Sequence, residues 1–408
     1  MSSRVHLKRS LSLTQMVLYG LGTTIGAGIY ALVGELAGIA GYFAPISFLI
    51  AAFMATLTAM SFAELSGRFP LAAGAALYVK EGFGSQSLST LTGLLVILAG
   101  LVSAAALING FVGYLHQFIT LDRIPIIILT TFTLGAIAAW GISTSVSIAS
   151  FITLIEIGGL LLIVAVSLMG TPFHADTMIS TLIPSADFAQ WSVIFAGTLL
   201  AFYAFIGFED MVDVAEEIKD VKRNLPLAII LTLVITTILY MLIMVTAVLA
   251  VPPEQLAKSK APLTFLYQHF TGNDASLISI IGLLAIINGA LIQIIMASRV
   301  MYGLGSRGQL PALLSIVNTQ TKTPLTATFI ATITVLVLAL LGHLSLLAEI
   351  TSLIMLCIFA MINLALVKVK KQSPNTADSI NFPPWIPMLG FIVSLSFLAF
   401  TFLNVTVF

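Results

Sequence analysis

The chain contains 408 residues, of which 59% are hydrophobic and only 8% are charged, and its 17 basic and 17 acidic side chains cancel. Soluble domains carry about 25% charged residues, so this composition excludes a soluble globular protein and indicates one that crosses a membrane many times. The zero net charge itself identifies no partner, and we expect no nucleic acid among the partners.

Eleven apolar runs follow one another along the chain. Each approaches the roughly 20 residues that are needed to cross the hydrocarbon core of a bilayer. No hydrophilic stretch between them is long enough to fold as a separate soluble domain. We therefore expect one all-α integral membrane domain over residues 1–408, with 11 transmembrane helices. The runs cover residues 12–39, 43–66, 87–116, 124–141, 146–169, 190–215, 225–251, 276–304, 324–342, 346–367 and 386–407.

Lysine and arginine side chains predict which way the chain enters the membrane. With the N-terminus on the cytoplasmic side, 14 of the 17 basic residues lie in inner segments, and only Arg123, Lys258 and Lys260 lie in outer ones. Basic residues are enriched on the cytoplasmic side of membrane proteins. We therefore expect a multi-pass protein of the cell inner (plasma) membrane, with the N-terminus in the cytoplasm and, if there are 11 spans, the C-terminus outside.

The first and the sixth apolar runs are interrupted by glycine, at Gly26 and Gly28 in the first and at Gly207 in the sixth. Glycine destabilises a helix interior, and unwound backbone at membrane depth is tolerated only where protein buries it or where it lines a water-filled cavity. The Ile-Gly pairs at residues 25–26 and 206–207 are 181 residues apart, at matching places in two halves of the chain. Such a pair indicates the substrate site of a secondary transporter. The alternative is that the glycines only let helices pack closely.

We expect the break in the first run to expose backbone N–H groups at the start of its outer half, where the helix dipole favours a carboxylate. Carbonyl groups left unpaired before this break and in the sixth run would accept hydrogen bonds from an ammonium group. Together these groups would bind both ends of a zwitterionic α-amino acid. The N–H groups belong to Gly26, Ala27, Gly28 and Ile29, and the carbonyls to Thr23, Thr24, Ile25, Tyr203, Ala204 and Phe205, with Gly207 beside them.

Four stretches of sequence resemble the amino acid–polyamine–organocation (APC) superfamily of transporters, and most closely its cationic-amino-acid-transporter-like branch. They read GLGTTIGAGIY at residues 20–30, FAELSGRFP at 62–70, AFIGFE at 204–209 followed by AEEIK at 215–219 and RNLP at 223–226, and ASRVMYG at 297–303. The resemblance implies a leucine-transporter-like fold with broken helices 1 and 6. In that fold residues 12–169 and 190–367 form a five-plus-five inverted repeat, and residues 386–407 add an extra helix. It also implies that Phe205 caps the bound substrate.

Polar side chains inside the apolar runs are candidates for a pocket around the side chain of the substrate. Glu209 and Asp210 follow the break in the sixth run, where two carboxylates would favour a cationic substrate; alternatively, they face water in an inner vestibule. The other candidates could equally form interhelical hydrogen bonds, which contribute about 0.6 kcal/mol each. They are Ser103 and Asn109 in the third run, Asn288 and Gln293 in the eighth, and Thr351 and Ser352 in the tenth.

Charged residues in the loops after the second and the sixth runs lie on the cytoplasmic side in this topology. They could form an inner gate that breaks during transport, or they could be solvated loop charges. They are Glu64, Arg68, Glu216, Glu217, Lys219 and Arg223.

Glu156 lies near the middle of the fifth run. A charged side chain at bilayer depth costs free energy, so such a residue is a candidate for a functional role. Members of the family that this chain resembles often carry lysine at this position. Because this chain has glutamate there, the resemblance does not decide which ion is coupled to transport. Burial disfavours the charged form of a carboxyl group. We therefore expect Glu156 to carry H⁺, with a bond to the carbonyls of the first run or to Ser298 that changes on protonation. Na⁺ binding and a neutral structural role are the alternatives.

These features predict a secondary active amino acid transporter that works by alternating access, with H⁺ as the coupling ion and a small neutral amino acid as the substrate. A transporter or exchanger of cationic amino acids or polyamines is the alternative. A channel is the alternative from another class, but it needs a more continuous polar lining. We expect no enzyme, metal site or cofactor, because the five histidines have no metal-binding spacing such as H-E-x-x-H. No sequence feature predicts the oligomeric state.

Overall fold

The computed structural model describes residues 11–71, 74–140, 146–170, 181–373 and 380–405. Nearly all of these residues are helical, and the described part of the chain contains no β-strand beyond an isolated bridge between Leu11 and Ile218. The prediction of an all-α membrane fold is confirmed. Arg4, Lys8 and Arg9, which contribute to the predicted orientation, lie outside the described residues.

Helices occupy all the expected apolar runs, because a chain segment in hydrocarbon can satisfy its backbone polar groups only internally. The elements are, in chain order, α1 (Leu13–Ala27), α2 (Ile29–Ala40), η1 (Gly41–Phe43), α3 (Ala44–Arg68), α4 (Gly74–Phe83), α5 (Gln86–Leu115), α6 (Arg123–Trp140), α7 (Val146–Gly170), α9 (Phe188–Tyr203), η2 (Phe208–Glu217), α10 (Val221–Ala250), α11 (Pro253–Lys258), α12 (Pro262–Thr271), α13 (Ser276–Ser306), η3 (Ala312–Ser315), α14 (Leu325–Leu341), α15 (Leu344–Gln372) and α16 (Trp385–Val405).

Eight helical segments in the described part of the chain are long and apolar enough to cross a membrane. One of them, Ile29–Arg68, joins α2 through η1 to α3 and therefore contains parts of the first two expected spans. The apolar helices at Leu325–Leu341 and Trp385–Thr401 are shorter. The number of spans and the inverted repeat therefore stay predictions.

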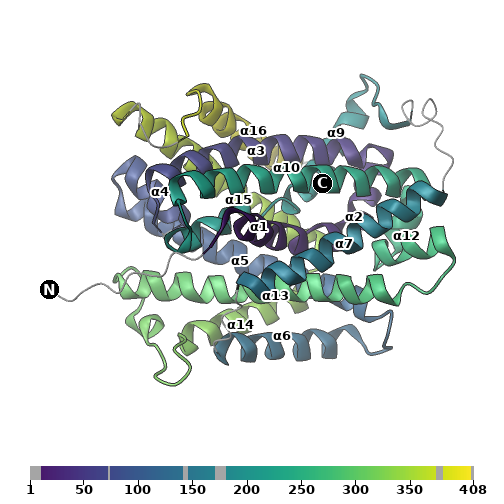
Figure 1. Ribbon diagram of the computed structural model, residues 1–408, viewed down its shortest axis with the longest axis horizontal. Coiled ribbons are helices and arrows are strands. Elements are labelled where there is room, and N and C mark those ends of the chain that lie inside the picture. The colour runs from purple at the N-terminus through teal and green to yellow at the C-terminus, as the bar shows by residue number, and fades with distance from the viewer. Residues whose placement is uncertain (1–10, 72–73, 141–145, 171–180, 374–379, 406–408) are drawn as a thin grey trace.

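The broken helix α1–α2 lies inside the bundle. Figure 1 shows α1 near the centre of the molecule, between α10 and α13, and α1 contacts α7, α10 and α13. The short helix α11 covers α2, because α2 has no side chain at Gly34 to hold it away: a Cβ there would lie 2.7 Å from the carbonyl oxygen of Leu256. The break is thus buried in protein, as unwound backbone in a membrane requires.

A buried ion cluster anchors the last two long helices to α3. The carboxylate of Glu64, which is fully buried, accepts hydrogen bonds from Arg68 at 2.7 Å, from Lys370 of α15, and from the backbone N–H of Phe382 at 2.9 Å. Arg68 also donates to the carbonyl of Ser373 at 2.7 Å. The cluster therefore holds the end of α15 and the segment before α16 against α3.

This cluster revises the expected inner gate. Glu64 and Arg68 do form an ion pair, but their further partner is Lys370 of α15. In the loop after the sixth run, the backbone groups of Glu217 and Lys219 instead pair with Leu11, at 3.0 Å each. The chain segment before α1 is therefore attached to that loop by backbone hydrogen bonds.

We expect Glu64→Gln to lower the stability of the protein by about 3–5 kcal/mol, because it leaves Arg68 and Lys370 buried without their counter-ion. The thermal unfolding midpoint of the purified protein measures the effect. Glu81→Gln is the matched control, because the Glu81 side chain is exposed on α4. Equal midpoints for the two variants would contradict the anchoring role of the cluster.

Candidate functional site

The first run breaks at a single residue, Gly28. Helix α1 continues through Gly26 and Ala27, and α2 begins at Ile29. Gly28 has φ −123° and ψ −67°, and its N–H donates to the carbonyl of Ile25 at 3.3 Å. The break is therefore shorter than expected, and the Gly28 N–H, which we expected to be open to a carboxylate, is engaged within the chain in this conformation.

The sixth run breaks over Ala204–Gly207. Helix α9 ends at Tyr203, and the N–H groups of Ala204, Phe205 and Ile206 donate to carbonyls three residues earlier, at 3.0–3.1 Å. Gly207 has φ 123°, a conformation that side chains rarely adopt. Its N–H donates to the Glu209 carboxylate at 2.9 Å. Glu209 therefore holds the break by capping it, a role that the sequence did not indicate.

The two breaks touch one another. A Cβ on Gly28 would lie 2.3 Å from the Cα of Ala204, and a Cβ on Gly207 would lie 2.6 Å from the carbonyl oxygen of Thr23. The hydroxyl of Thr23 donates to the carbonyl of Gly207 at 2.9 Å. The alternative role of these glycines, which is to let helices pack closely, therefore also applies at the two breaks.

Tyr240 of α10 links the two breaks, and sequence reasoning missed it. Its hydroxyl lies 3.0 Å from the carbonyl oxygens of both Thr24 and Ala204, two of the carbonyls that we expected to receive an ammonium group. A hydroxyl has one proton to donate, so it serves these two acceptors in turn. A tyrosine in the middle of an apolar run was the available signal, because the hydroxyl of a buried tyrosine needs a partner.

Phe205 lies in a buried aromatic cluster beside these carbonyls. Its ring centroid is 5.3 Å from that of Tyr240 and 6.1 Å from that of Phe48 of α3. The side chain is 1% exposed. In this conformation Phe205 therefore packs between α3 and α10, and the capping role stays a prediction.

A small cavity lies beside the sixth-run break. Its free space is about 30 Å³, which is room for one or two water molecules. Five of the eight expected pocket side chains line it: Ser103, Glu209, Asp210, Gln293 and Thr351. The remaining lining residues are apolar: Phe62, Ala75, Val96, Ala99, Gly100, Ile206, Met296, Met355 and Ile358. A molecule the size of an amino acid would fit into this cavity only if the surrounding helices moved further apart.

Asn109, Asn288 and Ser352 are not among the cavity-lining residues. The side chain of Asn109 accepts a hydrogen bond from Arg123 at 2.8 Å and donates to the carbonyl of Ala339 at 3.1 Å. It therefore joins α5 to α6 and α14, which is the interhelical alternative. Asn288 is buried on α13 away from the cavity.

Asp210 is buried at the edge of the cavity, with 7% of its surface exposed. Its Oδ2 atom has no hydrogen-bond partner among the described residues. Asp210 is therefore the acid at this break with unused hydrogen-bonding capacity.

Glu156 lies on α7, next to the first-run helix. Its side chain is fully buried, and neither carboxyl oxygen has a hydrogen-bond partner in the described part of the chain. Oε1 lies 3.8 Å from the position of a Cβ on Gly26. The Tyr30 hydroxyl of α2 donates to the backbone carbonyl of Glu156 at 2.6 Å. The hydroxyl of Ser298 donates to Ile294 of its own helix, so the expected bond between Glu156 and Ser298 is not formed in this conformation.

Comparison with known proteins gives consistent matches. A family model described as amino acid permease matches residues 11–407. The chain is 28% identical to the branched-chain amino acid permease BcaP of Bacillus subtilis, over 97% of this chain and 88% of that protein. It is 26% identical to the methylthioribose transporter of Bacillus subtilis, over 96% and 88% of the two chains. It is 27% identical to the vacuolar cationic amino acid transporter 4 of Arabidopsis thaliana, over 90% of this chain but 64% of that protein. The chain thus spans less than two thirds of the plant relative.

Proposed function

Since the chain belongs to the amino acid permease family, we propose that it is a secondary active transporter of amino acids that works by alternating access at the plasma membrane. The observation that carries this proposal is the contact between the two helix breaks, at Gly28 with Ala204 and at Thr23 with Gly207. Broken helices that meet near the middle of the membrane provide both a helix N-terminus for a carboxylate and carbonyls for an ammonium group.

The bound substrate takes over polar groups that the protein now uses internally. The carboxylate is bound at the start of α2, by the N–H groups from Gly28 onward, and the ammonium group replaces the Tyr240 hydroxyl at the carbonyls of Thr24 and Ala204. The side chain enters the cavity between α5, η2, α13 and α15. An outward movement of α10 would withdraw Tyr240 and free the carbonyls of Thr24 and Ala204 for the ammonium group.

We propose H⁺ as the coupling ion and Glu156 as its carrier. A buried carboxyl group without a hydrogen-bond partner is more stable when it is neutral, and Glu156 lies beside Gly26 of the broken helix. Its protonation therefore responds to movement of α1 against α7. Na⁺ coupling is the alternative.

A small neutral amino acid is the proposed substrate, and a cationic amino acid or a polyamine is the alternative. The cavity lining is largely apolar, and Glu209 already accepts the N–H of Gly207. The names of the relatives include both a branched-chain amino acid permease and a cationic amino acid transporter. Asp210 is the residue that would favour the cationic class.

We expect Asp210→Asn to retain the binding of small neutral amino acids, because the substitution removes a charge that a neutral side chain does not need. The measurement is a thermal-shift screen of the purified wild type and variant with alanine, leucine, arginine, lysine and putrescine, since a ligand of the folded state raises the unfolding midpoint. Asp122→Asn, at an exposed position before α6, is the matched control.

The alternative substrate class gives a different pattern in the same screen. Arginine, lysine or putrescine would then stabilise the wild type, and Asp210→Asn would lose that stabilisation while Asp122→Asn kept it. No stabilisation by any α-amino acid, in either variant or in the wild type, would contradict the proposed function itself.

A further inference from the structure

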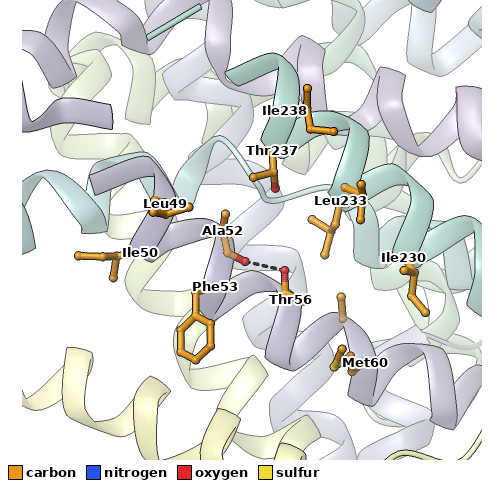
Figure 2. A pocket seen from close by; sticks show the side chains of 12 residues that line it. Leu49, Ile50, Ala52, Phe53, Thr56, Met60, Ile230, Leu233, Thr237 and Ile238 are labelled. Atoms are coloured by element: carbon orange, nitrogen blue, oxygen red, sulfur yellow. Dashed lines mark hydrogen bonds between the residues drawn. The ribbon is translucent and has the colours of Figure 1, made fainter. Parts of the chain in front are cut away.

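We propose that the groove between α3 and α10 is a binding site for an anionic phospholipid, with one acyl chain in the groove and the headgroup at Arg223. The groove has a volume of about 620 Å³ and lies on the outside of the bundle, away from both helix breaks. Figure 2 shows two rows of side chains, one from each helix, on either side of this space. The inference is independent of which substrate the protein carries.

The lining of the groove fits a hydrocarbon chain. Ten of the twelve lining side chains are apolar, and the others are Thr56 and Thr237. The Thr56 hydroxyl donates to the carbonyl of Ala52 on its own helix at 2.7 Å, so its proton is satisfied within α3. The complete lining is Leu49, Ile50, Ala52, Phe53, Thr56, Ala59 and Met60 of α3 and Ile230, Leu233, Val234, Thr237 and Ile238 of α10.

The large side chains on the rim of the groove are open to the surroundings. Leu49 and Phe53 of α3 are each 53% exposed, and Val234 and Ile238 of α10 are 50% and 55% exposed. The α3 part of the lining runs from Leu49 to Met60, about 16 Å along the helix axis at 1.5 Å per residue. A narrow apolar channel of this length takes an extended acyl chain lying along the helices.

A cationic side chain continues the same row at one end of the groove. Arg223 lies seven residues before Ile230, which is two helical turns, so that the two side chains share one face of α10 about 10 Å apart. Arg223 is exposed and lies in the first turn of the spanning segment Val221–Ala250. A basic side chain at this level meets the headgroups of the bilayer. An apolar groove that ends at a cation therefore matches an amphipathic ligand with a negative head.

The test measures lipid retention by native mass spectrometry of the purified protein. The probes are phosphatidylglycerol and phosphatidylethanolamine with identical acyl chains, added at equal concentrations. We expect the wild type to retain phosphatidylglycerol in preference, and Arg223→Gln to reduce this preference about fivefold, the effect of one basic residue near a charged membrane surface. Lys371→Gln, the same loss of charge at an exposed position on α15, should leave it unchanged.

A second variant tests the groove itself. We expect Thr56→Phe, which fills the groove, to lower the retention of both lipids, whereas Thr133→Phe, at an exposed position on α6, should not. Equal retention of the two lipids by the wild type would overturn the proposal, as would equal retention by the two phenylalanine variants. A dimer that Thr56→Phe dissociates, without any change in lipid retention, would show that a second copy of the chain occupies the groove instead.

Discussion

Gly28→Val is expected to weaken substrate binding and uptake severely. The added Cβ would lie 2.3 Å from the Cα of Ala204 and 2.5 Å from its Cβ, so the two helix breaks must separate at the point where the proposed carboxylate and ammonium positions meet. Overpacking of this kind costs about 1–3 kcal/mol, which corresponds to roughly a tenfold to hundredfold loss of affinity if the cost falls on the bound state. Thermal-shift titration and uptake into proteoliposomes measure it.

Gly303→Val is the control for this prediction. Gly303 lies inside α13, where nothing outside its own helix lies within 4 Å of a Cβ, so the variant adds the same side chain without the collision. Size-exclusion chromatography of both variants checks that they fold. If Gly28→Val kept wild-type affinity, or if the wild type bound amines without a carboxylate equally well, the proposed carboxylate site would be wrong.

Glu156→Gln is expected to eliminate accumulation of substrate on an imposed pH gradient. Glutamine keeps the size and polarity of the side chain but cannot exchange a proton, so the proposed link between protonation and movement of α1 is lost. Exchange of labelled for unlabelled substrate across the membrane, which needs no driving ion, should continue. Uptake into proteoliposomes under a pH gradient or a sodium gradient measures the first effect, and counterflow measures the second.

Glu81→Gln, at an exposed position on α4, controls for a general effect of losing a carboxylate. Wild-type uptake that follows the sodium gradient and ignores the pH gradient would refute H⁺ coupling. A Glu156→Gln variant that still accumulated substrate on the pH gradient would leave H⁺ coupling in place but would assign the proton to another group.

The sequence predicted the positions of the long helices well, because the bilayer imposes one requirement on every spanning segment: about 20 apolar residues with an internally bonded backbone. It also identified where helices break. It did not predict the length of the first break, because a glycine has more than one use. Gly26 stays helical, and a Cβ there would lie 2.9 Å from the carbonyl oxygen of Ala285, so Gly26 permits close approach of α13, whereas Gly28 marks the break.

Partners that come from distant parts of the chain were the least predictable. Glu64 is paired with Lys370, and Asn109 donates to the carbonyl of Ala339, and no local spacing relates the members of either pair. The partners of Tyr240 were equally unpredictable. Its position in an apolar run indicated that its hydroxyl needs a partner, but only the fold brings it to the carbonyls of Thr24 and Ala204. Sequence periodicity describes one helix at a time, and these contacts depend on how several helices are arranged.

The hydroxyl of Tyr240 has a consequence for the unloaded half of a transport cycle. A carrier that performs net uptake must return empty, and carbonyls stripped of their ligand inside a membrane would make that return slow, since an unsatisfied buried carbonyl is costly. In the transport cycle that we propose, Tyr240 donates to the carbonyls of Thr24 and Ala204 in turn and takes the place of the ammonium group while the empty protein returns. An obligate exchanger always changes conformation with substrate bound, so its carbonyls are never without a ligand. We therefore expect net import and not one-for-one exchange.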